Sequence, residues 1–300
     1  MNITKSLLES YFGKNKTVLD QARKFAEYLN SGRSKSSKSI VVYSDIHTGA
    51  KTSVCTNDPE ASDYKPNEFQ KTLFKIWNET IDELHQKPRF KVINGEPFDG
   101  PNKKNNGGGQ WSVNMADQLR EAEKLIKLIP GDETIFVKGS GYHVDDYGTS
   151  YEEILAHKLG ARKYSSWYND TFAEDFAQIR LNGVLINITH HIGFAKWAAY
   201  RTTALAREMA ALHFMKSQLG DIGVMVRSHV HYFVHVEFTH SHGFTNPCWK
   251  YPDRHLFRGG MGGTIPDIGC TEVIIEPNGK IIIEKHIADL ESKKPQVIDG

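Results

Sequence analysis

Residues 40–50 read IVVYSDIHTGA, a β-branched run that ends in Asp45-Ile46-His47. Such a run predicts a buried β-strand, because β-branched side chains pack well on a pleated sheet. Asp45 and His47 are two positions apart, so both side chains would lie on one face if the strand geometry continued. The stretch predicts a strand that presents a carboxylate and an imidazole where it ends.

Comparable groups of side chains follow three other predicted strands. They are GEPFDG (95–100) after FKVIN, THH (189–191) at the end of VLINITHH, and HVH (229–231) in GVMVRSHVHYF. Gly95 and Gly100 permit unusual backbone angles around the acidic turn. His229 and His231 alternate, so both can face one ion pair, whereas at most one of His190 and His191 is an easy ligand.

Each group also has an ordinary interpretation when it is taken alone. The alternatives are a turn aspartate with a solvated histidine, an acidic surface turn, and two exposed strand histidines. Four such groups in this order favour a site for two divalent cations, which can stabilise both the attacking and the leaving oxygens of a phosphoryl displacement. Mixed imidazole and carboxylate donors suit Mn, Fe or Zn better than calcium.

Composition places the chain among ordinary globular proteins. Its 300 residues are 39% hydrophobic and 24% charged, and they include neither a membrane-span run nor a secretory signal. Cys55, Cys248 and Cys270 form no CxxC, so a disulfide framework and a structural zinc knuckle are not expected and a cytoplasmic location is the default. A net charge of +1 gives no global attraction to nucleic acid.

The order of predicted elements indicates a mixed α/β domain. Helical patterns at about 67–87, 113–129, 151–159 and 194–218 alternate with strands, and Asn278-Gly279 predicts a β-hairpin turn. Residues 1–39 are predicted as an N-terminal helix with a polar connector, and residues 40–300 as the main domain. Trp197 and Tyr200 fall in the last helical pattern, where aromatic residues are more often core than base-stacking groups.

The ordered motifs resemble the calcineurin-like metallophosphoesterase superfamily. That family has D-x-H, then G-D-x-x-D-G, G-N-H, a lone histidine and G-H-x-H, and the resemblance covers roughly residues 40–290. Residues 139–161 (GSGYHVDDYGTSYEEILAHKLGA) further resemble a variant found in phage and prophage members. The resemblance implies an α/β fold, a four-layer αββα sandwich of two mixed β-sheets flanked by helices.

The resemblance also implies roles for individual residues. The first metal would be held by Asp45, His47 and His231, and the second by His190 and His229, with Glu96 bridging both. His143 matches the histidine beside the leaving group, where it would act as general acid. Ser140 falls nearest to the family's asparagine ligand. Asn94 and Asp99 are expected to orient loops and ligands.

Three positions depart from the family pattern. Glu96 stands where the family has aspartate, Ser140 nearest to its asparagine, and Ser228 where it usually has glycine. Glutamate is one methylene longer, so it must bridge with a changed backbone or bind one ion differently. A second ion that is held weakly and recruited with substrate is consistent with these changes.

The function that the resemblance implies is hydrolysis of phosphodiester bonds by a metal-activated hydroxide, with Mn favoured over Fe and Zn. The absence of arginine from residues 101–110 favours DNA, RNA or a nucleotide over a phosphoprotein. The alternatives are a phosphomonoesterase or protein phosphatase, and a catalytically weak metal-binding module. No membrane partner is expected, and the oligomeric state stays open. A phage-encoded chain would work in the cytoplasm of a bacterial host.

Overall fold

The computed structural model describes most of the chain between residues 36 and 290. The described ranges are 36–59, 64–85, 87–103, 106–146, 148–165, 170–195, 197–252 and 265–290. The predicted N-terminal helix (1–30) lies outside them, so the division of the chain at residue 39 stays a prediction. In these ranges, every helix is too short or too polar to cross a bilayer.

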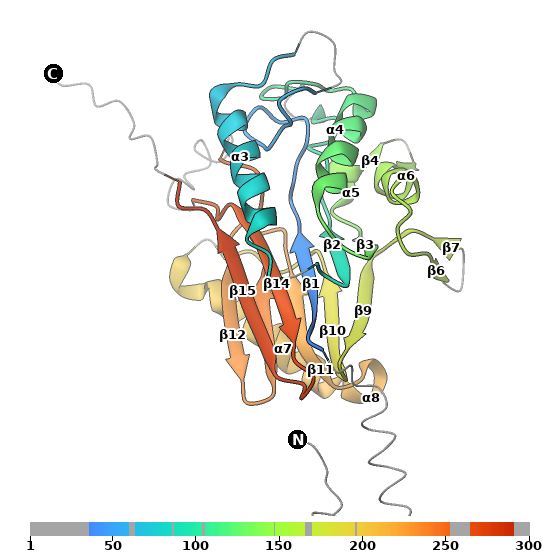
Figure 1. The fold of residues 1–300 in the computed structure, drawn as a ribbon, viewed down its shortest axis with the longest axis vertical. Helices are drawn as coiled ribbons and strands as arrows, with labels where there is room; N and C mark the ends of the chain where they lie inside the picture. Colours follow the sequence, from blue (N-terminus) through green and yellow to red (C-terminus); the bar gives the residue numbers. More distant parts are fainter. Residues whose placement is uncertain are drawn as a thin grey trace, which may run out of the picture.

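The first of two large sheets has six strands (Figure 1). Their order is β15 (Ile281–Ile287), β14 (Gly269–Ile275), β1 (Lys38–Tyr43), β2 (Phe90–Asn94), β3 (Glu133–Val137) and β8 (Ala173–Glu174). β1, β2, β3 and β8 run parallel, whereas the hairpin β14–β15 joins β1 antiparallel. The predicted hairpin is confirmed, and its turn residue Gly279 has a φ of 86°.

The second sheet has five strands and is also mixed. Their order is β12 (Val234–Phe238), β13 (Ser241–Thr245), β11 (Ile222–Arg227), β10 (Val184–Thr189) and β9 (Phe176–Leu181). β10, β11 and β13 are parallel, and β9 and β12 pair antiparallel at the two edges. Two short ribbons complete the strands: β4 (Asp145–Asp146) with β5 (Thr149–Ser150), and β6 (Tyr164–Ser165) with β7 (Asp170–Thr171).

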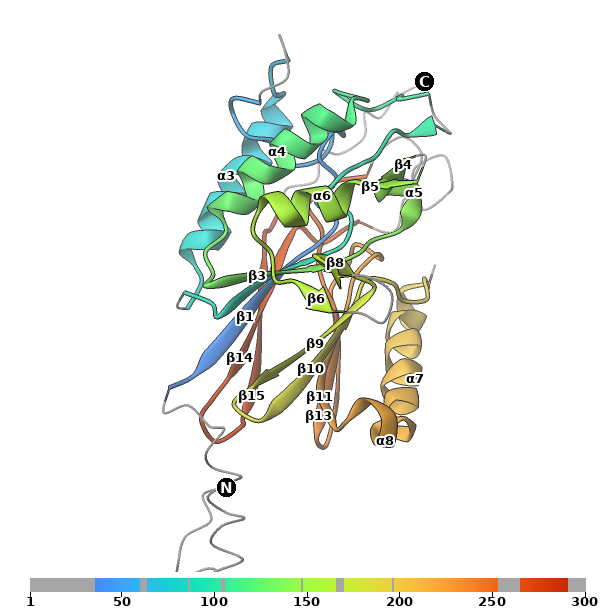
Figure 2. The ribbon, with the colours of Figure 1, turned by 90° about the vertical axis from the view of Figure 1, so that its right-hand side faces the viewer.

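Helices cover the outer face of each sheet (Figure 2). α3 (Glu68–Asp82), α4 (Met115–Leu128) and α6 (Tyr151–Lys158) lie on the first sheet, and α7 (Arg201–Phe214) lies on the second. Shorter helices are α5 (Gly141–Val144), the 3₁₀ turn η2 (Ala198–Tyr200) and α8 (Lys216–Leu219). The predicted four-layer αββα sandwich of two mixed sheets is confirmed.

Alternation along β1 explains why the sandwich has two separate cores. Ile40 and Val42 pack between the sheets, whereas Val41 and Tyr43 pack beneath the helices. A strand that is buried on both faces reads as a continuous apolar run, as IVVY does. Under α3, the ring centroids of Tyr43 and Trp77 are 4.7 Å apart. This packing fixes the carboxyl end of β1, where the first motif begins.

The long helical prediction over 194–218 is only partly correct. The described residues of this region form η2, α7 and α8, with α7 ending at Phe214. Only Leu205 and Met209 of α7 are buried, and they pack on Met225 of the sheet. The apolar contact that stabilises the helix is therefore made by its middle turns.

Candidate metal centre

The side chains of the predicted motifs meet at one end of the two sheets. Asp45 and His47 follow β1, Glu96 follows β2, Ser140 and His143 follow β3, His190 follows β10, and His229 and His231 follow β11. The carboxyl ends of parallel strands lie at the same edge of a sheet, where open α/β folds form their sites. The topology thus brings together residues that are up to 186 positions apart, as between Asp45 and His231.

The backbone at five of these residues is left-handed. The φ angles are 51° at Asp45, 52° at His47, 54° at Glu96, 71° at His229 and 61° at His231. Residues other than glycine seldom adopt this region, and each instance costs on the order of 1–3 kcal/mol. Backbone hydrogen bonds hold the turn, from Asp45 N to Gly95 O (3.0 Å) and from His47 N to Glu96 O (3.0 Å). Asp45 and His47 therefore converge through a left-handed turn and not through strand alternation.

The first group of ligand atoms belongs to Asp45, His47, Glu96 and His231. His47 Nε2 lies 3.1 Å from Glu96 Oε2 and 3.2 Å from His231 Nε2. His231 Nε2 lies 3.2 Å from Asp45 Oδ1. These are the residues that the resemblance assigns to the first metal, with Glu96 as the bridge.

The second group shares Glu96 and adds His190 and His229. Glu96 Oε1 lies 3.2 Å from His190 Nε2 and 3.5 Å from His229 Nδ1. The Ser140 hydroxyl donates a hydrogen bond to the same carboxylate oxygen. All seven residues predicted as ligands are therefore brought together, while metal binding itself stays a prediction.

The donor atoms fit a pair of divalent cations. Asp45 Oδ1, His190 Nε2 and His229 Nδ1 are buried and have no hydrogen-bond partner. Buried polar atoms in proteins are nearly always satisfied, so orphaned atoms that face one another call for a ligand. Nitrogen and oxygen donors at 2.0–2.2 Å from an ion lie roughly 3 Å apart. The pairs His47–Glu96 (3.1 Å), His231–Asp45 (3.2 Å) and His190–Glu96 (3.2 Å) have this separation, whereas His190 Nε2 and Asp45 Oδ1 are 3.9 Å apart. Mixed imidazole and carboxylate ligands suit Mn, Fe or Zn.

The electrostatics of the site favour positive charge beside its buried carboxylates. Burial raises the pKa of Glu96, but attraction by His190 and the neighbouring histidines outweighs burial and holds the pKa well below its ordinary value. Burial lowers the pKa of His190, but the carboxylates of Asp45 and Glu96 outweigh it and raise the pKa to about 9. Bound cations would take the place of the proton on His190.

Polar groups behind the ligands fix their orientation. His190 Nδ1 is 2.7 Å from the Asn94 carbonyl oxygen, and Asn94 Nδ2 donates to Ser228 Oγ (2.7 Å). Asp99 Oδ1 lies 3.4 Å from His47 Nδ1 and accepts from Lys250 Nζ (2.7 Å). A carbonyl or carboxylate on the second ring nitrogen selects the tautomer that can ligate a metal. The geometry agrees with the orienting roles predicted for Asn94 and Asp99.

His143 stands beside the first group on α5. Its Nδ1 is 2.8 Å from the Asp99 carbonyl oxygen, and its ring meets that of His47 edge-on with centroids 4.8 Å apart. Because Nδ1–H donates to the carbonyl, Nε2 is the nitrogen that gains and loses a proton. Burial, and then the proximity of His47, lower the pKa of His143 below its ordinary value.

Glu152 is a site residue that the motifs did not indicate. It is fully buried on α6, where Oε1 accepts from Glu96 N (3.1 Å) and Oε2 accepts from Gly139 N (3.0 Å). It thus ties the Glu96 turn to the loop that carries Ser140. A Cβ on Gly139 would lie 2.6 Å from Glu96 N, so this loop needs glycine. The helical spacing of Glu152 with buried Leu155 is the sequence signal that marks it as inward-facing.

Replacing Glu152 tests this tie. Glu152→Ala leaves two buried N–H groups without an acceptor, so we expect it to lower the free energy of unfolding by about 3 kcal/mol, since each unsatisfied buried group costs roughly 1–3 kcal/mol. Glu152→Gln keeps an acceptor oxygen and is the matched control. Urea denaturation measures both. Equal stability of the alanine variant and the wild type would contradict the tie.

Glu152 also predicts a pH dependence of stability. Burial raises its pKa to about 8 from an ordinary value of 4.5, so folding favours the protonated carboxyl. The protonated Glu152 carboxyl contributes fully to the free energy of unfolding below about pH 4.5, and this contribution is lost as the pH rises to about 8. We expect Glu152→Gln, which cannot ionise, to flatten the stability profile of the metal-free protein across this window. An unchanged slope in denaturation midpoints between pH 5 and 8 would contradict this expectation.

The expectation that Trp197 and Tyr200 are core residues is wrong. Their side chains are 72% and 62% exposed, because they belong to the turn before α7 and not to its packed face. Phe194, between His191 and this turn, is 48% exposed. Arg201 places its guanidinium 4.2 Å from the ring centroid of Tyr232, the neighbour of His231. Exposed aromatic side chains thus lie on the segment that follows the candidate ligand His190 in sequence.

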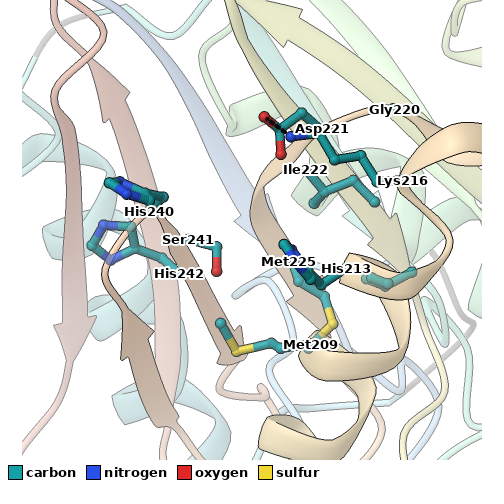
Figure 3. A pocket seen from close by; sticks show the side chains of 11 residues that line it. Met209, His213, Lys216, Gly220, Asp221, Ile222, Met225, His240, Ser241 and His242 are labelled. Atoms are coloured by element: carbon teal, nitrogen blue, oxygen red, sulfur yellow. Dashed lines mark hydrogen bonds and ion pairs between the residues drawn. The ribbon is translucent and has the colours of Figure 1, made fainter.

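A pocket of about 170 Å³ opens at the opposite end of β11 (Figure 3). Met209 and Met225 line it from α7 and β11, and Lys216 pairs with Asp221 at 2.8 Å on its border. β11 starts at this pocket and ends at the loop of His229, a span of about 20 Å for six residues. The pocket is therefore separate from the ligand groups.

Comparisons with known proteins give only distant likenesses. No family model matches the chain, and no curated protein matches it. Among solved structures, Vps29 from Entamoeba histolytica complexed with Zn²⁺ is 11% identical, with a TM-score of 0.40 over 83% of this chain and 98% of that one. A predicted phosphoesterase from Streptococcus pneumoniae is 12% identical, with a TM-score of 0.37 over 85% and 100% of the two chains.

A putative 5′-nucleotidase from Staphylococcus aureus, in complex with α-ketoglutarate, is a third similar structure. It is 11% identical, and the TM-score is 0.44 over 88% of this chain and 56% of that one. The function proposed below therefore rests on the residues of this chain.

Proposed function

We propose that this chain is a metal-dependent phosphoesterase of the calcineurin-like type that hydrolyses phosphodiester bonds. The observation that carries the proposal is the pair of ligand groups that share Glu96. A carboxylate common to two groups is the arrangement that a two-metal site requires, and two-metal sites are typical of phosphoryl displacement.

The residues divide between the two ions as the resemblance implies. Asp45, His47 and His231 would hold the first ion, and His190 and His229 the second, with Glu96 common to both and Ser140 beside the second. When bound, the cations supply Lewis-acid activation of water and neutralise charge on the phosphoryl oxygens. We favour Mn²⁺ among the ions that this donor set fits.

His143 has the role of the proton donor. Its Nδ1–H donates to the Asp99 carbonyl, so Nε2 would carry the proton for the departing oxygen when the ring is protonated. Because the pKa of His143 is lowered, this protonated form gains population as the pH falls. Asp99 and Asn94 keep the rings of His47 and His190 in one orientation through the contacts described above. Exposure of α5 residues Gly141 and Tyr142 leaves this edge of the site open to solvent and to a substrate.

The aromatic side chains favour a nucleotide or nucleic-acid substrate. Trp197 and Tyr200 are exposed on the segment that follows His191, and Tyr142, which precedes His143, is 42% exposed. Stacking of a base on an aromatic ring contributes about 1–3 kcal/mol. A protein phosphatase has no need of such rings, so we place that alternative second, and the comparison of diester and monoester below decides between the two ester classes.

A catalytically weak metal-binding module is the other alternative. Ser140, which falls nearest to the position of the family's asparagine ligand, donates a hydrogen bond from its hydroxyl to Glu96. This hydrogen bond needs no catalysis, so it is equally compatible with a protein that binds metal and hydrolyses no ester. Stoichiometric metal binding with no hydrolysis of any ester would select this alternative.

Hydrolysis of bis-p-nitrophenyl phosphate by metal-stripped protein tests the proposal. We expect no activity without metal and restored activity with Mn²⁺, because Asp45 and Glu96 then have their ions. The monoester p-nitrophenyl phosphate is the parallel substrate, and we expect it to be hydrolysed more slowly. Faster hydrolysis of the monoester would overturn the diester assignment, and inactivity with Mn²⁺, Fe²⁺ and Zn²⁺ would overturn the enzyme assignment.

A further inference from the structure

A second cluster of histidine and carboxylate side chains lies away from the metal centre. It joins His85, in the loop after α3, to Glu272 of β14 and Glu284 of β15, and one ligand atom from each lies within 4.8 Å of the others. α3 lies over this hairpin (Figure 1). Glu272 pairs with Val41, four residues before Asp45, which is about 13 Å along the strand. The cluster is therefore distinct from the centre at Asp45.

Two carboxylates of the cluster face each other across the hairpin. Glu272 and Glu284 are direct partners in the antiparallel register, so their side chains lie on the same face. Like charges directly opposite each other destabilise a strand pair. The Glu272 side chain is fully buried and that of Glu284 is 35% exposed, so water screens the repulsion only in part. A cation between the two strands would remove it.

The neighbouring histidines satisfy the carboxylates only in part. His85 Nδ1 lies 3.3 Å from Glu284 Oε2, and His85 N donates to Glu272 Oε2 at 3.2 Å. Glu272 Oε1 and His286 Nε2 are nevertheless buried without a hydrogen-bond partner. His286 Nε2 is 3.8 Å from Glu272 Oε2, beyond hydrogen-bond distance. A carboxylate oxygen of the cluster, Glu272 Oε1, and a neighbouring ring nitrogen, His286 Nε2, are therefore both buried and unsatisfied.

One separation in the cluster equals that of two ligands around one ion, and all three ligand atoms lie within 4.8 Å of one another. Ligands at 2.0–2.1 Å in a tetrahedron lie about 3.3 Å apart, as His85 Nδ1 and Glu284 Oε2 do. One imidazole and two carboxylates form a donor set that zinc accepts and calcium does not favour. His85 and Glu284 are partly exposed, with side chains 64% and 35% accessible, so an ion has a path from solvent.

We propose that His85, Glu272 and Glu284 form a structural zinc site that fastens the end of α3 to the edge hairpin β14–β15. His286 lies next to Glu272, with its Nε2 3.8 Å from Glu272 Oε2 and its Nδ1 3.5 Å from Glu83 Oε2. The site stabilises β15, the edge strand of the first sheet, and takes no part in hydrolysis.

Zinc stoichiometry of the full chain tests this site. We expect Glu284→Gln and His85→Ala each to lower the zinc bound per chain by one ion, measured by equilibrium dialysis against Zn²⁺ alone. The matched control is Glu276→Gln on the same hairpin, whose side chain is 31% exposed and pairs with Lys280. Because both altered positions are partly exposed, the variants are expected to fold, and circular dichroism checks this.

Two further readouts separate the site from the catalytic centre. We expect Zn²⁺ to raise the melting temperature of the Glu276→Gln control more than that of Glu284→Gln, while Mn²⁺-dependent hydrolysis is unchanged in both. Anomalous scattering at the zinc edge should give a peak between His85 and Glu272. Equal zinc binding by Glu284→Gln, His85→Ala and the control would overturn the site. If the wild type hydrolyses no phosphoester, the proposed function fails, but the zinc bound per chain still tests this site because that measurement does not depend on hydrolysis.

Discussion

Glu96→Gln is expected to abolish Mn²⁺-dependent hydrolysis of bis-p-nitrophenyl phosphate, with kcat reduced by at least about 10²-fold. Residues that only orient metal ligands cost about 10–100-fold in affinity or activity when they are replaced, and Glu96 contacts both ligand groups directly. The amide keeps the shape of the side chain but loses the charge and one of the two acceptor oxygens. Steady-state kinetics with bound-metal analysis measures the loss.

Glu96→Asp is the matched control for this prediction. Aspartate keeps the charge and both oxygens and is the residue that the resembled family has here, so we expect it to retain metal-dependent activity. In the metal-free protein, Glu96→Gln should also lower the pKa of His190 from about 9, because one of the two carboxylates that raise it is gone. Nuclear magnetic resonance titration of the imidazole measures that change. Full activity of Glu96→Gln would contradict the bridging role.

His143→Ala is expected to lower kcat by about 10²–10³-fold on a substrate with an alkoxide leaving group, because a general acid contributes typically 10²–10⁴-fold. The loss should be much smaller on bis-p-nitrophenyl phosphate, since nitrophenolate departs without a proton. The ratio of the two effects distinguishes proton donation from a structural role. Hydrolysis of a dinucleotide and of the nitrophenyl ester, measured in parallel, gives this ratio.

His213→Ala is the control for the histidine substitution. His213 lies on α7 at the pocket beyond the other end of β11, so its removal should change neither rate. An equal loss on both substrates in His143→Ala would show that His143 only supports the site. His143 is absent from the two groups that share Glu96 but forms a further group with His47 and Asp99. Unchanged metal content in His143→Ala, which we expect, therefore distinguishes a proton donor from a ligand.

The placement of the long strands was predictable from the sequence because each of them carries a local signal, whereas the two-residue strands β4, β5, β6 and β7 were not predicted. The runs IVVY and VLINIT are apolar and β-branched, and the structure has β1 and β10 there. α7 was predicted too long, because η2 precedes it and because only two of its residues, Leu205 and Met209, are buried. Helical periodicity could not reveal where that apolar contact begins.

The candidate ligands were also predictable, although not by the geometry first inferred for them. Asp45 and His47 were expected to share a strand face, whereas both have positive φ values in a turn. Left-handed backbone at charged residues has no local sequence signal, because neighbouring loops impose it. Glu152 was not identified, since an acidic residue in the first turn of a helix usually faces solvent and complements the helix dipole.

The sequence by itself determined the α/β layering, the order of the ligand-bearing loops and the chemical nature of the donors, because strand propensity and residue type are local properties. Only the tertiary structure decided that Asp45 and His47 converge through left-handed backbone, that Trp197 and Tyr200 are exposed, and that His85, Glu272 and Glu284 lie together. Those facts depend on strand register and on the packing of α3 over the hairpin, which join residues nearly two hundred positions apart.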